Sequence, residues 1–254
     1  MSPQTPRISV VIPVYNEEQG ISPLWRALAP ALEALGESWE VLLVDDGSTD
    51  GSLREMLSLR RRDPRVRILR FPTNQGQSAA FWCGFRRARG RTVVTLDADL
   101  QNDPADIAVL LRALEGADLA IGWRHRRDDP FTSRIASRIA NRFRNWTTAE
   151  EIHDVGCSLK AFRREVLERL FPFRGMHRFY PTLARMGGFR VVEVKVAHRP
   201  RATGRSKYGI WNRLLGPLQD CLAVRWMKRR HLGGLEAEEV PDPVEAPPEA
   251  RRQA

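Results

Sequence analysis

Three carboxylates and two amides follow an apolar run in the segment TLDADLQNDP, residues 95–104. A buried carboxylate is costly unless a cation or hydrogen-bond donors pair with it. Alternate side chains of an extended chain point the same way, so Asp97, Asp99 and Gln101 are expected to converge. Carboxylate and amide oxygens are the ligands that hard divalent ions prefer. The segment therefore predicts a site for Mg²⁺ or Mn²⁺.

Helix capping is a second interpretation of these acids. Asp103 precedes Pro104, and this pair is typical of the first turn of a helix, so we expect Asp103 to be a cap. Capping does not explain Asp97 and Asp99, which lie at the end of a predicted strand. A D-x-D motif is common by chance, so its value depends on where the fold places it.

Short β-branched runs alternate with longer helical patterns in the first half of the chain. The expected strands span 8–14, 40–46, 66–71, 92–97 and 118–122. The expected helices run from Ser22-Pro23 to residue 35, from Asp50 onward, over 76–89 and from Asp103 onward. This alternation predicts βαβ units in an α/β fold with a doubly wound, mainly parallel sheet, whose ligands lie at the carboxyl ends of the strands. The first strand is nearly all apolar, so both its faces should be covered.

The second half departs from this alternation. Helices are expected around 131–146 and 163–170, followed by a strand over 190–196. We expect it to extend the same domain, so that residues 1–232 form one unit. Residues 233–254 are acidic and proline-rich with few large apolar side chains, and this tail is predicted to be disordered.

The bulk composition narrows the class of protein. The 254 residues carry a net charge of +10, and the acidic tail leaves +14 on the rest. Such a surface attracts nucleic acid, anionic lipid or phosphorylated substrates, unless the arginines simply face solvent. A run of about 18 apolar residues and a signal peptide are both missing, so a cytosolic location is expected. The three cysteines are widely spaced, which favours reduced thiols over disulfides or a metal site.

Six segments of the sequence resemble the motifs of a known family in their residues, order and spacing. They are VVIPVYNEE, LLVDDGSTD, NQGQSAAFWCG, TLDADLQNDP, GWRHR and RATGRSKYG. Together they resemble the family 2 glycosyltransferases of the GT-A fold, and the last segment resembles the branch of dolichol-phosphate mannosyltransferases and polyprenyl-phosphate glycosyltransferases. The resemblance covers roughly residues 8–230. It implies a nucleotide-sugar half over 8–125, an acceptor half over 126–209 and an interfacial helix over 210–232.

The resemblance assigns a nucleotide-sugar site to residues after the first, second and fourth strands. Those that match the family's contacts to base and ribose are Pro13, Tyr15, Glu17, Val44 and Asp46. Those that match its metal and diphosphate site are Asp97, Ala98, Asp99 and Gln101. Pro13 and Val44 also suit ordinary strand and core positions. Asp45 and Asp50 suit turn and capping roles.

The remaining residues match family positions near the phosphates of the substrates or near the acceptor. Arg124, Arg201 and Lys207 match family positions beside the phosphates, and the planar guanidinium of arginine suits bidentate phosphate binding. Asp154 matches a family acid that faces the acceptor, where it acts as general base in some relatives. A turn role before Gly156 is the alternative for Asp154. His125, His153, His177 and His198 lack metal-ligand spacing and are interpreted as structural.

The resemblance implies an inverting, metal-dependent transfer of a sugar from a nucleotide-diphosphate sugar to polyprenyl phosphate, at the cytoplasmic face of the membrane. The helix predicted from Trp211 carries apolar residues along one side and a basic end, which suits an anionic membrane surface or, alternatively, packing on the core. Nucleic acid is not expected as a partner, whereas an integral-membrane partner protein is possible. Transfer to a sugar hydroxyl and a non-catalytic nucleotide-binding module are the alternative functions.

Overall fold

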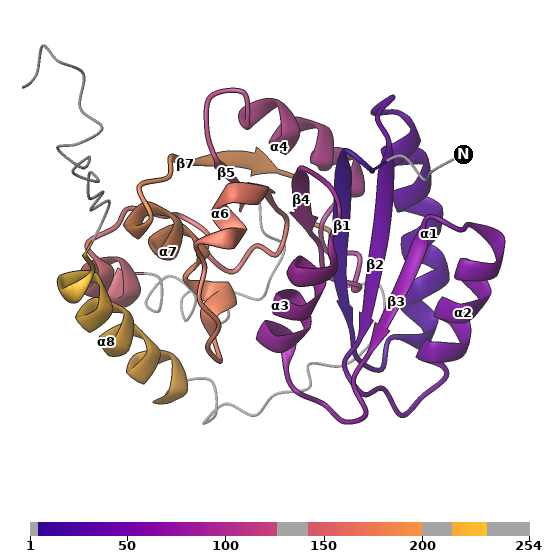
Figure 1. Cartoon of the computed structure of the whole chain (residues 1–254), viewed down its shortest axis with the longest axis horizontal. Coiled ribbons are helices and arrows are strands. Elements are labelled where there is room, and N and C mark those ends of the chain that lie inside the picture. Colours follow the sequence, from indigo (N-terminus) through magenta and orange to yellow (C-terminus); the bar gives the residue numbers. More distant parts are fainter. Residues whose placement is uncertain (1–4, 126–141, 200–214, 233–254) are drawn as a thin grey trace, which may run out of the picture.

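The computed structural model describes residues 5–125, 142–199 and 215–232. Its centre is one seven-stranded sheet with the order β3-β2-β1-β4-β6-β5-β7. Figure 1 shows this sheet between two layers of helices. Among the described residues, no helix combines the length and the apolar character needed to cross a membrane.

The first half of the sheet is parallel, as the alternating pattern predicts. Its strands are β1 (Ile8–Val14), β2 (Trp39–Asp45), β3 (Val66–Arg70) and β4 (Thr92–Thr95). Strand β1 pairs in parallel with both β2 and β4, and β2 pairs with β3. These strands end at one edge of the sheet, which we call the carboxyl edge.

The second half contains a strand that the sequence did not predict. Strand β6 (Lys160–Arg163) runs antiparallel between β4 and β5 (Leu119–Arg124), and β7 (Val191–Val196) pairs in parallel with β5. Because β6 is reversed, its first residue, Lys160, lies beside the last residue of β4, Thr95. The carboxyl edge therefore also receives the segment that precedes β6.

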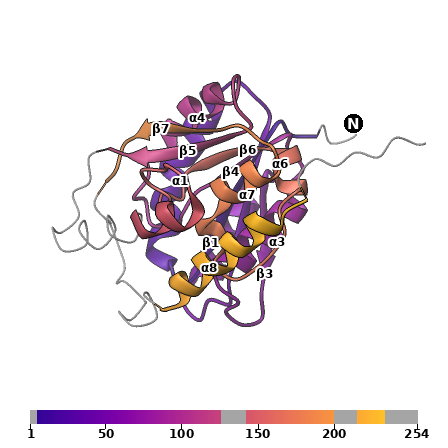
Figure 2. The same ribbon diagram turned by 90° about the vertical axis from the view of Figure 1, so that its left-hand side faces the viewer.

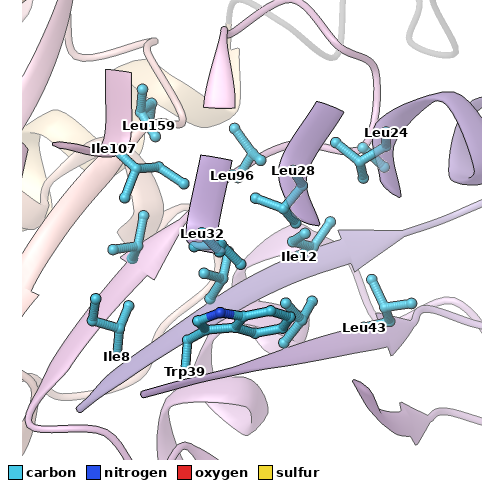
Figure 3. Packing of buried hydrophobic residues seen from close by; sticks show 14 of the residues in the cluster. Ile8, Ile12, Leu24, Leu28, Leu32, Trp39, Leu43, Leu96, Ile107 and Leu159 are labelled. Carbon is cyan, nitrogen blue, oxygen red and sulfur yellow. The ribbon is translucent and has the colours of Figure 1, made fainter. Parts of the chain in front are cut away.

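Helices α1 (Glu18–Glu33) and α2 (Ser52–Arg62) cover one face of β1–β3, and α3 (Gln77–Arg87) covers the other. Strand β1 sends alternate side chains to both faces: Ile12 joins the cluster under α1, and Val11 joins the cluster under α3. Figure 3 shows the leucines of α1 directed at β1 and β2. Each buried leucine contributes about 1.5–3 kcal/mol, so both layers hold the sheet in place. The prediction that both faces of β1 are covered is confirmed.

Shorter elements complete the second half. They are the 3₁₀ turn η1 (Pro104–Asp106), α4 (Ile107–Ala113), α6 (Arg164–Glu168), η2 (Met176–Arg178), α7 (Tyr180–Met186) and α8 (Leu215–Arg230). Residues 142–148 are also helical, and the rest of the helix predicted around 131–146 lies outside the described residues. The three cysteines are free, as predicted.

Helix α1 begins four residues before the predicted cap at Ser22, and Pro23 lies inside it. The reason is a set of hydrogen bonds from a distant loop. The backbone N–H of Glu17 donates to Ser52 Oγ at 2.8 Å, and that of Glu18 donates to Asp50 Oδ2 at 3.2 Å. Side chains that follow β2 thus satisfy the first donors of α1, which need partners in any helix. The sequence pattern around Ser22 does not reveal this contact, because the partners lie in a distant part of the chain.

Gly90 gives a direct test of the packing between β1 and β4. Its N–H donates to Ser9 Oγ at 2.8 Å, and a Cβ added there would lie 2.6 Å from the Ser9 backbone nitrogen. We expect Gly90→Ala to lower the free energy of unfolding by about 1–3 kcal/mol because the backbones must separate. Gly116→Ala is the control, since a Cβ there meets nothing within 4 Å. Equal urea midpoints for the two variants would contradict this account.

Candidate active site

The acidic segment after β4 forms a turn. Strand β4 ends at Thr95, two residues earlier than predicted, because its antiparallel partner β6 begins opposite that residue. Leu100 has a φ of 60°, in the left-handed region, and the Asp99 carboxylate accepts the N–H of Gln101 at 3.2 Å. The extended alternation expected for Asp97, Asp99 and Gln101 is therefore wrong. The turn still gathers charge, since Asp99 contributes to the raised pKa of Asp97.

Asp97 is partly buried among groups that hold its carboxylate. Burial is the main cause that raises its pKa to about 6, and repulsion from Asp99 adds to it. Hydrogen bonds from Ser158 and Gln77 and the positive charge of Lys160 act in the opposite direction. The Gln77 side-chain N–H donates to Asp97 Oδ1 at 2.8 Å. Two acids thus share a site at which protonation of Asp97 occurs close to neutral pH.

Gln77, Ser158 and Lys160 were not predicted as site residues. Gln77 opens α3, and Ser158 and Lys160 belong to the segment that leads into β6. Lys160 is 3% exposed, and its ammonium donates to the carbonyls of Val155 and Cys157. Burial lowers its pKa from the ordinary value. The available signal was a lysine inside the run GCSLKAF, in a chain whose basic residues are mostly arginine.

The loops after β1 and β2 hold each other in place. The N–H of Asn16 donates to Ser48 Oγ at 3.0 Å, and Asn16 Oδ1 accepts the N–H of Thr49 at 2.8 Å. Asp50 Oδ1 accepts the N–H of Ser52 at 2.9 Å, and Asp45 Oδ1 accepts that of Ser48 at the same distance. The turn roles predicted for Asp45 and Asp50 are confirmed, whereas the residue at the N-cap of α2 is Gly51.

Asp46 organises the next loop of the same edge. Its carboxylate accepts the N–H of Gln75 at 2.7 Å, the N–H of Gly76 at 2.9 Å and the side-chain amide of Asn74 at 3.0 Å. Gly47, with a φ of 71°, lies so close to the 73–74 backbone that a Cβ there would be 2.5 Å from it. Asp46 therefore orders the residues that precede α3 and Gln77.

The other residues assigned to the base and ribose lie on the same pair of strands. Pro13 faces Val44 in the register of β1 and β2, and Val44 is fully buried in the core. Tyr15 and Glu17 follow β1 and are partly buried. The contact of these four residues and Asp46 with a nucleotide stays a prediction.

Arg124 and Asp154 bind each other. The Arg124 guanidinium donates to both oxygens of the Asp154 carboxylate, at 2.6 and 2.9 Å, and the two side chains are 11% and 5% exposed. The sequence assigned these residues separate roles, toward the phosphates and toward the acceptor. A Cβ at Gly156 would approach the guanidinium to 3.1 Å, so this glycine leaves room for the pair.

A layer of polar and aromatic side chains supports Asp154. Glu193 of β7 accepts the N–H groups of His153 and Asp154 at 2.9 and 3.2 Å, and the His153 ring stacks on Trp123 at 4.3 Å between centroids. His177 is partly buried, its Nδ1 lies 2.7 Å from Ser78 Oγ, and desolvation lowers its pKa to about 3. These contacts fit the structural roles predicted for the two histidines.

The structure describes the predicted cap Asp103 but not two of the residues predicted to bind phosphate. Asp103 accepts the N–H of Ala105 at 3.1 Å and caps η1, so its predicted capping role is confirmed. Arg201 and Lys207, predicted beside the phosphates, lie outside the described residues.

Asp97 and Asp99 have the donor chemistry of a hard-cation site. The described residues contain no cluster of three or more His, Cys, Asp and Glu side chains, so a metal ion would rely on this pair of carboxylates and on amide, water or substrate oxygens. Mg²⁺ sites commonly use one or two carboxylates together with substrate phosphates. The shared charge of Asp97 and Asp99 and the raised pKa of Asp97 are consistent with such a site.

The order of strands and the acidic turn after β4 are those of the GT-A fold. The sequence comparison gives the family: the model of Glycosyl transferase family 2 matches residues 9–171, and the chain belongs to this family. It is therefore a glycosyltransferase, as its motifs predicted.

Curated relatives match most of the chain. A dodecaprenyl-phosphate galacturonate synthase of Rhizobium johnstonii is 39% identical over 232 residues, which cover 89% of this chain and 68% of the relative. An undecaprenyl-phosphate 4-deoxy-4-formamido-L-arabinose transferase of Salmonella paratyphi B is 38% identical over 86% of this chain and 68% of its own length.

Solved structures share the fold at lower identity. Glucosyl-3-phosphoglycerate synthase of Mycobacterium tuberculosis, crystallised with Mn²⁺, UDP and glucosyl-3-phosphoglycerate, superposes with a TM-score of 0.66 at 21% identity, covering 88% of this chain and 80% of that one. The same enzyme with Mg²⁺ and UDP gives a TM-score of 0.65 at 20% identity, covering 88% and 79%. The GT-A fold predicted from the sequence is confirmed.

Asp97 should destabilise the metal-free protein at neutral pH. Its pKa is raised to about 6, so folding at pH 7 keeps a carboxylate ionised at a cost that the unfolded chain does not have. We expect Asp97→Asn to raise the free energy of unfolding at pH 7 by about 1–3 kcal/mol. The gain should disappear near pH 4, where folded Asp97 is protonated. Urea unfolding at both pH values measures this, and a gain of equal size at pH 4 would contradict it.

The Arg124–Asp154 pair should contribute strongly to folding. Asp154→Ala leaves a buried guanidinium without its bidentate partner, and we expect a loss of about 3–5 kcal/mol in the free energy of unfolding. Arg54→Ala is the control, because Arg54 also contacts a glutamate but is 73% exposed, and it should cost about 0–1 kcal/mol. If chemical denaturation gave similar losses in the free energy of unfolding for the two variants, the strong contribution expected of the buried pair would be contradicted.

Proposed function

We propose that this enzyme transfers a sugar, with inversion, from a nucleotide-diphosphate sugar to polyprenyl phosphate, using Mg²⁺ or Mn²⁺. The observation that carries the proposal is the 38–39% identity, over most of the chain, to two transferases named for polyprenyl-phosphate acceptors. The pair of carboxylates after β4 supports the metal, and the family supports the nucleotide-sugar donor.

Asp97 and Asp99 would hold the metal ion, with Gln101 as a third oxygen ligand. A bound divalent cation offsets the negative charge that develops on the departing diphosphate. Gln77 and Ser158 fix the orientation of Asp97, and Lys160 balances its charge. The loops ordered by Asn16 and Asp46 lie at the same edge, where Pro13, Tyr15, Glu17 and Val44 are proposed to contact the nucleoside.

The Arg124–Asp154 pair favours a phosphate acceptor over a sugar hydroxyl. A hydroxyl needs a base to remove its proton in the transition state, whereas a phosphate is already an anion at neutral pH. Both oxygens of Asp154 accept from Arg124, so taking up a proton would disrupt a buried ion pair. We therefore propose that Asp154 positions Arg124. Arg124, Arg201 and Lys207 would then gather the two phosphorylated reactants.

A lipid-linked acceptor sets the proposed location. Polyprenyl phosphate keeps its chain in the bilayer and its phosphate at the surface, so the enzyme would work peripherally at the cytoplasmic face, with an integral-membrane protein as a possible partner. Residues 8–125 would form the nucleotide-sugar half and 126–209 the acceptor half of one domain over 1–232. The helix at 210–232 would form the membrane-facing part.

The proposal is tested by assaying transfer to polyprenyl phosphate in detergent with Mn²⁺ or Mg²⁺. UDP forms of the sugars named in the relatives are the first donors to try. Asp99→Asn should lower the rate roughly 100-fold or more, because charge stabilisation at the leaving group is lost. Asp103→Asn is the control: it removes a nearby charge but keeps a capping side chain, so activity should stay within a few-fold.

Removal of the metal by a chelator should stop the wild-type reaction, and added Mn²⁺ should restore it. A lipid-linked sugar formed equally well by Asp99→Asn would contradict the metal site. If product formed only with sugar or glycolipid acceptors, the proposed acceptor would be wrong, and the enzyme would transfer to a hydroxyl group.

A further inference from the structure

Asn102 is a buried amide in the acidic turn, and neither the motifs nor the family resemblance gives it a role. It is 4% exposed, and a buried side-chain amide needs hydrogen-bond partners. Its Nδ2 donates to Ser158 Oγ at 2.9 Å, and its Oδ1 accepts from the Cys157 thiol, with 3.3 Å between the two atoms. The side chain therefore joins the turn after β4 to a segment 55 and 56 residues later in the sequence.

The two partners use opposite ends of the amide. Burial raises the pKa of the Cys157 thiol to about 11, so the thiol keeps its hydrogen and donates to Oδ1. The amino end of Asn102 is then left to face the Ser158 hydroxyl. A hydroxyl has one hydrogen to donate. Because Ser158 Oγ accepts from Asn102, its own hydrogen is available for a different acceptor.

The acceptor of the Ser158 hydrogen is Asp97. The hydrogen bond from Ser158 lowers the pKa of Asp97, which is the effect of a donor on an ionised carboxylate. Gln77 holds the same carboxylate from α3, with 2.8 Å between its side-chain nitrogen and Asp97 Oδ1. Asp97 is thus held from two sides, and on the side of β6 the direction of the hydroxyl depends on Asn102.

The backbone of Ser158 is fixed independently of Asn102. Figure 2 shows β6 between β4 and β5, and Ser158 enters the sheet beside the end of β4. The Ser158 carbonyl accepts the Thr95 hydroxyl at 2.6 Å. Loss of the Asn102 amide would therefore free the Ser158 hydroxyl to turn without moving the main chain that carries it.

The backbone of the turn also has its own support. Asn102 forms an isolated β-bridge with His198, and the N–H of Arg199 donates to the Gln101 carbonyl at 2.9 Å. Leu100, with a φ of 60°, adopts a left-handed conformation that a leucine keeps only where its surroundings impose it. The contacts with the chain after β7 help to impose it. A substitution that removes only the Asn102 side chain therefore leaves the turn in place.

We propose that Asn102 is a positioning residue for the metal site, because it directs the Ser158 hydroxyl at Asp97 and so holds the orientation of that carboxylate. Asn102 acts through Ser158 and contacts neither the metal nor a substrate. The inference rests on the proposed function, which includes the metal. Removal of the groups that orient a metal ligand typically weakens metal binding roughly 10–100-fold.

Titration with Mn²⁺ in the absence of acceptor tests the inference. The thermal midpoint is followed as Mn²⁺ is added together with the nucleoside diphosphate that shifts the wild type most. We expect Asn102→Ala to need roughly tenfold more Mn²⁺ than the wild type for half of its own shift. Equal Mn²⁺ requirements would overturn the inference.

Gly90→Ala is the control for a general loss of stability. Gly90 packs against Ser9 before β4 begins, at the edge of the sheet opposite the acidic turn. This variant should unfold at a lower temperature than the wild type but keep its Mn²⁺ requirement within about twofold. A rise in the Mn²⁺ requirement of Gly90→Ala as large as that of Asn102→Ala would show that destabilisation alone causes the effect.

A double-mutant cycle tests the route through Ser158. Ser158→Ala should raise the Mn²⁺ requirement about as much as Asn102→Ala, because either change removes the directed hydroxyl. The double variant should resemble Ser158→Ala alone, within about twofold, since both substitutions interrupt one path. If the two effects multiplied instead, Asn102 would act on the metal site by a separate route, and the inference would be wrong.

A transfer assay separates this inference from the proposed function. At saturating Mn²⁺, Asn102→Ala should transfer sugar within a few-fold of the wild-type rate, because the proposed metal ligands remain. If the Mn²⁺ requirement rises as expected but polyprenyl phosphate is not glycosylated by the wild type, the proposed acceptor fails and the role of Asn102 stands. If the wild type forms product and the Mn²⁺ requirement is the same in both proteins, this inference alone fails.

Discussion

Lys160 carries a basic group into the interior of the sheet, between the acidic turn after β4 and the segment that leads into β6. Its ammonium interacts with Asp154, in the segment that leads into β6, and with Asp97 after β4, while the carbonyls of Val155 and Cys157 accept its hydrogen bonds. A buried charge without such partners costs several kcal/mol. The acidic turn after β4 and the segment that carries Asp154 are therefore linked through Lys160, the first residue of β6.

Hydrogen bonds and ion pairs between separate segments also order the rest of the carboxyl edge. Asp46 is satisfied by the 74–76 loop, the loops after β1 and β2 exchange hydrogen bonds, and Asp154 is held by Arg124 and Glu193. These polar groups find their partners on segments that are distant in the sequence. This places a set of acids and bases around one region before any substrate arrives, as preorganised catalysis requires.

Local patterns were sufficient for the first half of the fold and insufficient for contacts between distant segments. The parallel strands follow from β-branched runs of the right length, such as Ile8–Val14. The early start of α1 depends on Ser52 and Asp50, the end of β4 depends on β6, and the Arg124–Asp154 pair joins residues thirty apart. Within the described part of the chain, the motif residues Asp46, Asp97, Asp99 and Arg124 lie at strand ends on one edge. Gln77, Ser158 and Lys160, which act on Asp97, had no pattern that reveals a tertiary neighbour.

The reversed direction of β6 has a consequence for the connection between β5 and β6. Because β5 ends and β6 begins at the same edge, the connection over residues 125–159 leaves the sheet and returns to it at one place, like the loop of a hairpin. The register of the strands therefore does not depend on the length of this connection. The segment that is proposed to meet the acceptor therefore joins the sheet at its two ends alone, at the edge where the parallel strands end.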